Sequence, residues 1–303
     1  RQEDVVTFRA GIEEEPEDVA KRIKDLFTEV KKKYSDVLDS SDNINLDSKS
    51  IYYVVGELQN FSLTDSSRDA IGDAFEVFID HALKGGQGQF FTPRNVVKMV
   101  IEIVDPSTDE KILDPACGSG GFLIEAMRFI WEKVEQEGKK LNWPDHEIEI
   151  EKQKVAIKNL RGVDKDYFLS KVAKAYMALL GDGRGGVFCE NSLDSPKNWN
   201  KKTQIEIKLE SFDVIVTNPP FGAKLPVTGD EIIKQFEFGY KWKFNKKENQ
   251  WEKGKIKDKE APQILFIERC LQLLSPGGRL GIVLPDGILG NDKLGYIRNH
   301  IIK

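Results

Sequence analysis

A glycine-rich turn joins a predicted strand to a predicted helix, with the sequence Asp114-Pro115-Ala116-Cys117-Gly118-Ser119-Gly120-Gly121. Glycines at such a turn let the backbone approach a ligand closely, at the carboxyl ends of parallel strands. A dinucleotide fingerprint requires a third glycine at position 123, where Leu123 stands, so the turn disfavours an NAD(P) site. The alternative is a tight strand-to-helix turn that binds no ligand.

A carboxylate, Asp164, ends the next predicted strand at residues 161–164. At this place an Asp can accept hydrogen bonds from both hydroxyls of a ribose, as in other nucleoside-binding sheets. Taken alone, an Asp after a strand is more typical of a helix N-cap. Together with the glycine-rich turn, it indicates a site for a nucleoside.

The tetrapeptide Asn218-Pro219-Pro220-Phe221 directly follows the apolar strand at residues 212–216. The prolines fix the backbone carbonyls, the Asn218 amide oxygen adds an acceptor, and Phe221 presents a flat apolar face. This combination suits a planar amine, whose NH2 group donates two hydrogen bonds while its ring stacks on the phenyl group. The nitrogen lone pair then remains free to attack an electrophilic methyl. A Pro-Pro turn that only closes a strand is the alternative.

A fourth segment, Gly88-Gln89-Phe90-Phe91-Thr92-Pro93-Arg94, immediately precedes a predicted helix with apolar residues between 96 and 104. Thr92 is predicted as the N-cap and Pro93 as the first helical residue. We expect the aromatic pair to cover a bound ligand on the side opposite the glycine-rich turn.

The elements that position these motifs belong to the second part of the chain. After residue 85, short apolar strands alternate with amphipathic helices, which predicts an α/β fold with a Rossmann-like, doubly wound parallel sheet. The predicted strands cover residues 111–114, 161–164, 187–189, 212–216 and 279–284, and the last helix covers 262–274 before a break at 275–278. Residues 1–85 are predicted to form a small helical N-terminal domain, with helices near 19–30 and 67–83, before a glycine-rich hinge at 84–88. The predicted domains are therefore 1–85 and 86–303.

Composition excludes several classes of protein. The 303 residues are 40% hydrophobic and 31% charged, which excludes a disordered chain or a collagen-like fibre. No apolar run approaches the roughly 18 residues of a membrane helix. Three cysteines make no disulfide framework and show no zinc-type spacing, so a cytoplasmic location is expected. The chain begins with Arg1 rather than Met and with no leader, so we expect a chain trimmed from a longer one.

The net charge of −5 is distributed unevenly. Residues 1–85 hold 11 Lys and Arg against 19 Asp and Glu, whereas the remaining residues hold 34 against 31. An asymmetry of this size is more typical of two differently solvated surfaces than of a binding site.

The motifs and their order resemble the N6-adenine DNA methyltransferases, and more narrowly the modification (M) subunits of type I restriction-modification systems. The segment at 89–93 precedes the glycine-rich turn, and Asn218 follows Gly118 by 100 residues. Residues 263–268 and 278–287 are also similar to later segments of that family. The resemblance covers residues 86–303, and the acidic helical start resembles the family's N-terminal domain.

The resemblance implies the S-adenosylmethionine-dependent methyltransferase fold, with S-adenosyl-L-methionine as cofactor and N6 of adenine in double-stranded DNA as methyl acceptor. It implies that Asp114 lies near the methionine amino end of the cofactor, that Asp164 holds its ribose, and that Asn218 and the Pro219 carbonyl bind the adenine amine beside Phe221. The expected cofactor-binding residues are Gln89, Phe90, Phe91, Thr92, Pro93, Arg94, Asp114, Gly118, Ser119, Gly120, Gly121 and Asp164, and the expected catalytic residues are Asn218, Pro219, Pro220 and Phe221. The implied partners are a specificity (S) subunit and a restriction (R) subunit, and any translocating motor is another chain because no Walker motif is present.

Several alternatives remain open at the level of sequence. The acceptor could instead be a protein glutamine or an RNA guanine, or the chain could be a non-catalytic scaffold that binds the cofactor. Either Asn191 or Asp194 could contact the cofactor adenine. The alternation of aromatic residues with lysines from Phe236 to Phe244 predicts a strand or hairpin. This segment either packs its aromatic face on the domain, which we favour, or grips phosphates or a flipped nucleotide.

Overall fold

The computed structural model describes residues 6–35, 37–61, 92–180, 186–222 and 226–302. The chain divides into two compact units, of which one contains Arg1–Gln87 with Ala178–Leu180 and the other contains Gly88–Met177 with Gly181–Lys303. The helix predicted at 67–83 and the hinge predicted at 84–88 lie outside the described residues. The domain boundary at residue 85 therefore stays a prediction.

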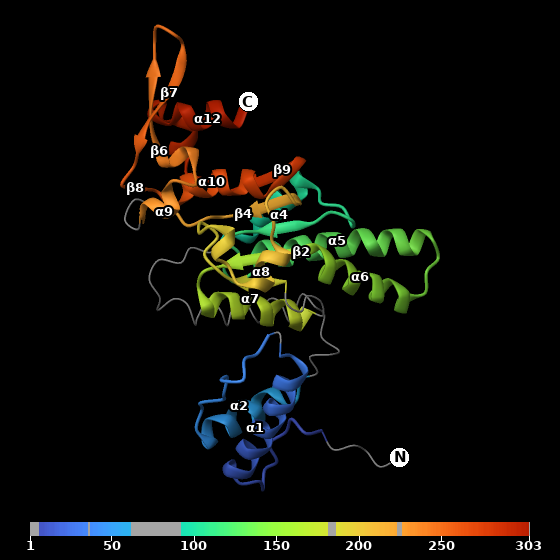
Figure 1. Ribbon diagram of the computed structural model, residues 1–303. Coiled ribbons are helices and arrows are strands. Elements are labelled where there is room, and N and C mark those ends of the chain that lie inside the picture. Colours follow the sequence, from blue (N-terminus) through green and yellow to red (C-terminus); the bar gives the residue numbers. More distant parts are fainter. Residues whose placement is uncertain (1–5, 36, 62–91, 181–185, 223–225, 303) are drawn as a thin grey trace. The chain divides into compact units, whose positions relative to one another are not determined.

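Two helices of the first unit pack on each other, α1 (Pro16–Lys33) and α2 (Ser48–Leu58), drawn in blue in Figure 1. The helix predicted near 19–30 is confirmed as α1. Its buried face and that of α2 share one apolar cluster, formed by Ala10, Val19, Ala20, Ile23, Ile51 and Val55. The periodicity of the sequence predicted α1 because its apolar residues form one stripe along the helix. Such a helix is stable only when a second element covers that stripe.

Five parallel strands form the sheet of the second unit, in the order β3-β2-β1-β4-β9 (Figure 1). They are β1 (Ile112–Asp114), β2 (Leu160–Asp164), β3 (Val187–Cys189), β4 (Phe212–Thr217) and β9 (Leu274–Ile282). The chain winds from β1 to β3 and then returns to the other side of β1, which confirms the predicted doubly wound sheet. A crevice therefore opens between the carboxyl ends of β1 and β4, where the winding direction reverses.

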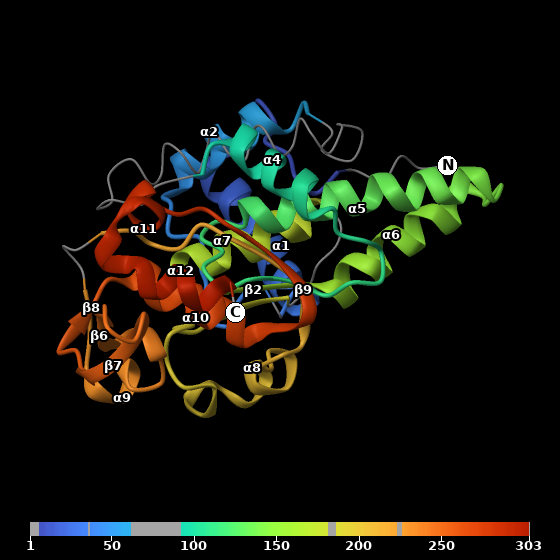
Figure 2. The ribbon, with the colours of Figure 1, turned by 90° about the horizontal axis from the view of Figure 1, so that it is seen from above.

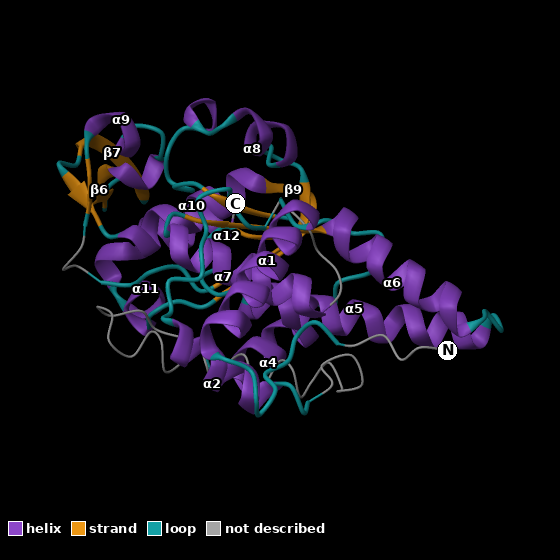
Figure 3. Cartoon of the chain, turned by 90° about the horizontal axis from the view of Figure 1, so that it is seen from below, coloured by secondary structure: helices purple, strands orange, loops and turns teal. Residues whose placement is uncertain are grey.

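Helices cover both faces of this sheet (Figures 2 and 3). One face carries α4 (Arg94–Val104), α5 (Gly121–Lys140) and α7 (Tyr167–Leu180), and α6 (Asp145–Asn159) packs along α5. The other face carries η1 (Pro196–Asn198), α8 (Lys201–Glu206) and α10 (Pro262–Leu273), and the described chain ends with α11 (Asp286–Gly290), η3 (Asp292–Leu294) and α12 (Gly295–Ile302). None of the helices in the described ranges is long and apolar enough to cross a membrane.

The last strand begins earlier than the sequence predicts. The break expected at 275–278 lies inside β9, because Phe212 pairs with Leu274 while Val214 pairs with Arg279. The intervening residues form a bulge in which Gly277 adopts a φ of +82° and Gly278 passes close to the backbone of β4. The Ser-Pro-Gly-Gly sequence therefore marks an irregularity within a strand and not a loop before it.

Residues 226–260 form an insertion between β4 and α10. It contains β5 (Val227–Thr228), α9 (Asp230–Ile233), η2 (Glu237–Gly239), β6 (Tyr240–Asn245), β7 (Gln250–Ile256) and β8 (Lys259–Glu260). The predicted hairpin is confirmed from Tyr240 onward, but Phe236 and Phe238 precede the strand and are buried. The Glu268 carboxylate accepts hydrogen bonds from the backbone N–H groups of Glu237 and Phe238, which turns the chain there into a 3-10 helix.

Gly162 of β2 offers a test of how tightly the sheet packs on α5. A Cβ at this position would lie 2.6 Å from the Leu123 Cδ1 atom and 3.2 Å from the Cys117 Cβ atom. We expect Gly162→Ala to lower the free energy of unfolding by about 1 to 3 kcal/mol, because the buried neighbours must move. Urea unfolding followed by tryptophan fluorescence measures the change.

The matched control is Gly287→Ala in α11, where an added Cβ meets no described atom within 4 Å. This variant should be as stable as the parent or slightly more stable, since alanine favours helix. An unchanged stability of the Gly162→Ala variant would contradict the packing described here.

Candidate active site

A pocket of about 100 Å³ lies at the carboxyl ends of β1 and β4. Six of its residues are predicted from the sequence: Thr92, Asp114, Gly118, Ser119, Gly121 and Asn218. Five more line it without having been predicted: Val97, Ala116, Cys117, Phe122 and Leu169. The pocket therefore joins three of the four sequence motifs at the place where the sheet topology predicts a ligand.

The glycine-rich turn forms one wall of the pocket. Gly118 and Gly120 adopt φ angles of +53° and +95°, a left-handed conformation that side chains disfavour. The Cys117 N–H donates to the Val163 carbonyl and thereby fixes the turn to β2. A Cβ at Gly118 or Gly121 would meet no described atom within 4 Å, so a side chain at either position would project into open space beside the pocket. The glycines thus keep room for a ligand next to the backbone at the start of α5, where N–H groups lack helical partners.

Asp164 connects β2 to this turn. Its Oδ2 atom accepts a hydrogen bond from the Gly118 N–H at 2.9 Å, and its Oδ1 atom accepts one from the Asp166 N–H at 2.8 Å. Burial raises the pKa of this carboxyl group above its ordinary value. Asp164 does not itself line the pocket, but each carboxylate oxygen has a second lone pair that can accept a ligand hydroxyl.

Asp114 forms the floor of the pocket. It is 1% exposed, and its Oδ1 atom accepts a hydrogen bond from the Ala116 N–H at 3.0 Å. Burial raises the pKa of Asp114 to about 7. A buried carboxylate next to a ligand cavity is stabilised by a cationic group on the ligand.

Asn218 occupies the opposite side of the pocket, directly after β4. Its Nδ2 atom donates a hydrogen bond to the Thr92 Oγ1 atom at 2.8 Å. Its Oδ1 atom is buried and accepts no hydrogen bond from any described residue. An unsatisfied buried oxygen is unfavourable, so the site is built to receive a donor from a ligand.

The capping prediction for Thr92 is wrong. Helix α4 begins at Arg94 with Pro93 as its N-cap, and no side chain caps the helix. The Thr92 hydroxyl instead accepts the hydrogen bond from Asn218. Sequence alone missed this contact because 126 residues separate the two partners.

The rest of the tetrapeptide extends from the pocket to the surface. Pro219 is buried, Pro220 is exposed, and Phe221 is 39% exposed. The Gly222 N–H, immediately after the tetrapeptide, donates to the Gln263 Oε1 atom of α10 at 3.3 Å. Phe221 therefore presents an accessible aromatic ring a few residues from the free Asn218 oxygen.

Other predicted residues lie outside the lining. Pro93 and Arg94 are exposed, and Gly120 faces Ala173 of α7, which lies 3.3 Å from where its Cβ would be. Gln89, Phe90 and Phe91 lie outside the described residues. Leu169 joins the pocket from α7, and no local sequence signal marks it.

Residues 191–194, which follow β3, are held by hydrogen bonds within the segment. The Asn191 Nδ2 atom donates to the Asp194 Oδ1 atom at 3.2 Å, and the Asn191 Oδ1 atom accepts from the Leu193 N–H. Neither Asn191 nor Asp194 lines the pocket. Ser192 fixes the segment to the glycine-rich turn, because its hydroxyl donates to the Pro115 carbonyl at 2.5 Å.

Comparisons with known proteins show which family the chain resembles. The family model for N-6 DNA methylases matches residues 66–303. The chain is 29% identical over 264 residues to the type I restriction enzyme EcoEI methylase subunit of Escherichia coli, covering 86% of this chain and 45% of that protein. It is 27% identical over 226 residues to the StySPI methylase subunit of Salmonella potsdam, covering 74% of this chain and 36% of that protein. The chain thus spans less than half the length of these two relatives.

Among solved structures, the chain is similar to the methyltransferase subunit of a type I restriction-modification system from Streptococcus thermophilus. The TM-score is 0.60 and the identity 19%, with 95% of this chain and 56% of that chain covered. At this identity, the similarity shows the fold.

The raised pKa of Asp114 predicts how stability depends on pH. In the unfolded chain this group titrates near its ordinary value of about 3.9. The folded chain holds the proton until about pH 7, so the contribution of Asp114 to the free energy of unfolding falls as the pH rises from about 4 to about 7. The fall is at most about 4 kcal/mol. Urea unfolding without added ligand at pH 5 and pH 8 measures about 3 kcal/mol of this fall.

In the Asp114→Asn variant this part of the pH dependence should disappear, since the amide keeps the shape but does not titrate. The control is Asp109→Asn at an exposed position, which should retain the pH dependence of the parent. Identical pH profiles for the parent and the Asp114→Asn variant would show that Asp114 is not the titrating group.

Proposed function

This chain belongs to the N-6 DNA methylase family, and on that premise we propose that it transfers a methyl group from S-adenosyl-L-methionine to N6 of adenine in DNA, as the modification subunit of a type I restriction-modification system. The observation that carries the proposal is the buried Asn218 Oδ1 atom, which lacks a donor among the described residues while its amide group is bonded to Thr92. The exocyclic amine of adenine supplies such a donor.

The cofactor fits the wall made by the glycine-rich turn. Gly118, Ser119 and Gly121 leave space for it, and the start of α5 offers backbone N–H groups to its carboxylate. In this proposal Asp114 would pair with the cofactor's ammonium group, and Asp164 would accept hydrogen bonds from its ribose hydroxyls. When bound, S-adenosylmethionine supplies an electrophilic methyl group on a sulfonium centre.

The target adenine must leave the duplex to reach Asn218, because its N6 group is otherwise paired. Asn218 Oδ1 and the Pro219 carbonyl accept the two N6 hydrogens, and Phe221 stacks on the base. These hydrogen bonds draw the protons away from N6 and raise the nucleophilicity of its lone pair. With the cofactor bound, Asn218 and Pro219 would hold N6 with its lone pair free to accept the methyl group that the sulfonium centre supplies, and N6 would then lose a proton. Orientation and fixed hydrogen-bond acceptors account for most of the rate.

We also infer the assembly in which the chain works. The DNA is double-stranded, a specificity subunit selects the sequence, and a restriction subunit joins the complex. The helical N-terminal domain ends near residue 85. The three cysteines are free, which suits a cytoplasmic enzyme.

Replacing Asn218 by Ala tests the proposal. The variant should lose about 100-fold or more in the rate of methyl transfer, because the acceptor for N6 is gone. Its affinity for S-adenosylmethionine should change by less than about threefold, because the deleted carboxamide bonds Thr92 and would bond the base, whereas the glycine-rich turn proposed to hold the cofactor is unchanged. Single-turnover transfer of labelled methyl and equilibrium binding of the cofactor measure the two effects.

The matched control is Asn95→Ala at an exposed position of α4, which should behave as the parent. Normal transfer by the Asn218→Ala variant would overturn the assignment of this site.

Thr92 is a positioning residue, and a pair of variants tests that role. Thr92→Val removes the acceptor for the Asn218 amide, so the transfer rate should fall about tenfold, corresponding to one hydrogen bond. Thr92→Ser keeps the hydroxyl and should restore the rate. A Thr92→Ser variant as slow as Thr92→Val would show that packing of the methyl group matters and the hydrogen bond does not.

A further inference from the structure

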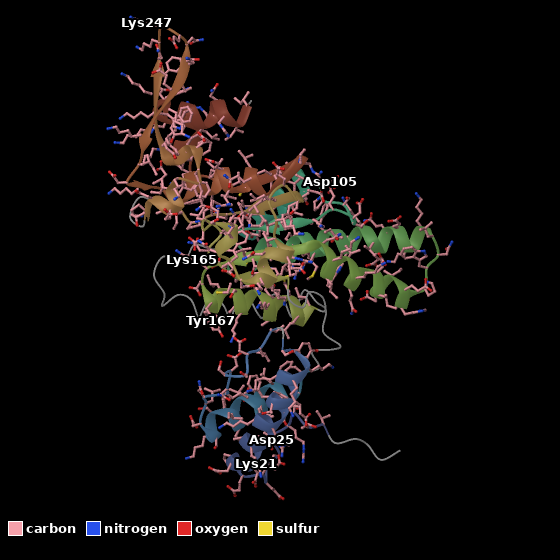
Figure 4. The ribbon with its side chains drawn as sticks, viewed as in Figure 1. Lys21, Asp25, Asp105, Lys165, Tyr167 and Lys247 are labelled. Carbon is pink, nitrogen blue, oxygen red and sulfur yellow. The ribbon has the colours of Figure 1, made fainter. Side chains whose placement is uncertain are left out.

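Exposed lysines gather on the β6–β7 hairpin, residues 240–256, which we call the basic arm. The arm contains six lysines against two glutamates. Five of the lysines are exposed and form no ion pair with a described residue: Lys241, Lys243, Lys246, Lys247 and Lys255. Lys247 lies at the tip of the arm, which extends away from the sheet of its unit (Figure 4).

The aromatic side chains of the arm are engaged in packing. Trp242 stacks on Tyr296 of α12 with the ring centroids 5.9 Å apart and the planes at 9°. Trp251 meets the same tyrosine edge-on at 5.8 Å, and it lies against Gly295, whose added Cβ would be 2.7 Å from its ring. These contacts attach the arm to α12, in agreement with the packing interpretation favoured from the sequence, whereas Phe244 near the tip is 39% exposed. Lys241 and Lys243 alternate with Trp242 along β6 and therefore point to the opposite, solvent-facing side.

Two other lysines of the insertion form ion pairs and contacts within the protein. Lys253 pairs with Glu237 at 2.7 Å and lies 3.8 Å from the centre of the Tyr240 ring. Lys257 is half-buried, donates to the Phe238 carbonyl at 3.0 Å and pairs with Glu260. The five exposed lysines have no such partners among the described residues. Neither packing nor ion pairing within the described protein therefore accounts for lysine at these positions.

The first part of the insertion, which precedes the arm, lies beside the pocket. β5 pairs with β8 and closes the insertion a few residues after Phe221. Val227, Ile232 and Phe236 of the insertion pack in one apolar cluster with Ala116, which lines the pocket. Farther along the insertion, β6 and β7 are six and seven residues long, so the arm extends about 20 Å. Along the axis of a DNA duplex, that length contains about six phosphates on each strand.

We propose that the basic arm binds the phosphate backbone of the DNA duplex next to the extruded adenine, through Lys241, Lys243, Lys246, Lys247 and Lys255. The inference rests on the proposed function, because it takes DNA as the substrate of the adjacent pocket. Contacts of this kind hold the duplex in register without reading its sequence. The arm therefore supplies affinity and orientation at the site of methyl transfer.

The test neutralises four arm lysines at once, Lys241→Gln, Lys243→Gln, Lys246→Gln and Lys247→Gln, in the full-length protein. Binding to a fluorescent duplex is measured over a series of KCl concentrations, and transfer of labelled methyl to the same duplex is measured in parallel. Each lost phosphate contact lowers the slope of log affinity against log salt by about 0.9. We expect the slope to fall by about 3.6 and the affinity at low salt to fall by about tenfold or more.

The matched control neutralises four exposed lysines elsewhere in the second unit, Lys140→Gln, Lys158→Gln, Lys202→Gln and Lys208→Gln. It removes the same charge and should keep a slope within about one of the parent's. An arm variant whose slope and affinity equal those of the control would overturn the role of the arm, whatever the transfer assay shows. A parent protein that binds no duplex would overturn it as well.

The proposed function fails on a different readout. If the arm variant loses salt-dependent binding but the parent transfers no methyl to adenine, the arm binds nucleic acid and the adenine methyltransferase assignment is wrong. If the parent methylates adenine and the arm variant does so with unchanged affinity and salt dependence, the function stands and the arm inference is wrong.

Discussion

The hydrogen bond from the Asn218 amide to the Thr92 hydroxyl sets the orientation on which the active site depends. The amide nitrogen is bonded there, and the buried amide oxygen accepts no hydrogen bond from any described residue. The bond exists only if the end of β4 lies beside the start of α4, and the strand order, with β4 between β1 and β9, provides this arrangement. On the other side of the pocket, the Asp164 carboxylate bonds the Gly118 N–H and holds the glycine-rich turn against β2. One sheet thus fixes both the open space beside the glycine-rich turn and the unpaired acceptor at Asn218.

The insertion after the tetrapeptide adds a charged surface to the same unit. Its base packs on Ala116 at the edge of the pocket, and Glu268 of α10 fixes its first turn through two backbone N–H groups. Its aromatic residues are used to attach the hairpin to α12, so its charge is displayed on the other face. The acceptor in the pocket, the exposed Phe221 ring and the lysines of the arm therefore follow one another along a single stretch of chain.

Sequence reasoning predicted the sheet because each strand is a short apolar run with a polar residue at its carboxyl end, and such runs are buried on both faces of a parallel sheet. It found Asp114, Gly118 and Asn218 because their motifs follow strands that the topology brings together. It misassigned Thr92, since a threonine before a proline and a helix has the same local pattern whether it caps the helix or bonds a distant side chain. It placed a break at Ser275–Gly278, because a bulge and a loop both require glycine at positive φ. Leu169 and Phe122 carry no motif, and only packing reveals them as pocket residues.

The most direct test of the central claim is the identity of the methylated product. The full-length protein, with a specificity subunit, is incubated with labelled S-adenosylmethionine and unmethylated duplex DNA. The DNA is then digested to nucleosides, which are separated by chromatography and identified by mass spectrometry. The arrangement of Asn218, Pro219 and Phe221 predicts that the label is found in N6-methyladenine. Label in a methylated cytosine, or in protein or RNA but not in DNA, would contradict the account, because the acceptor at Asn218 would then serve a different amine or amide.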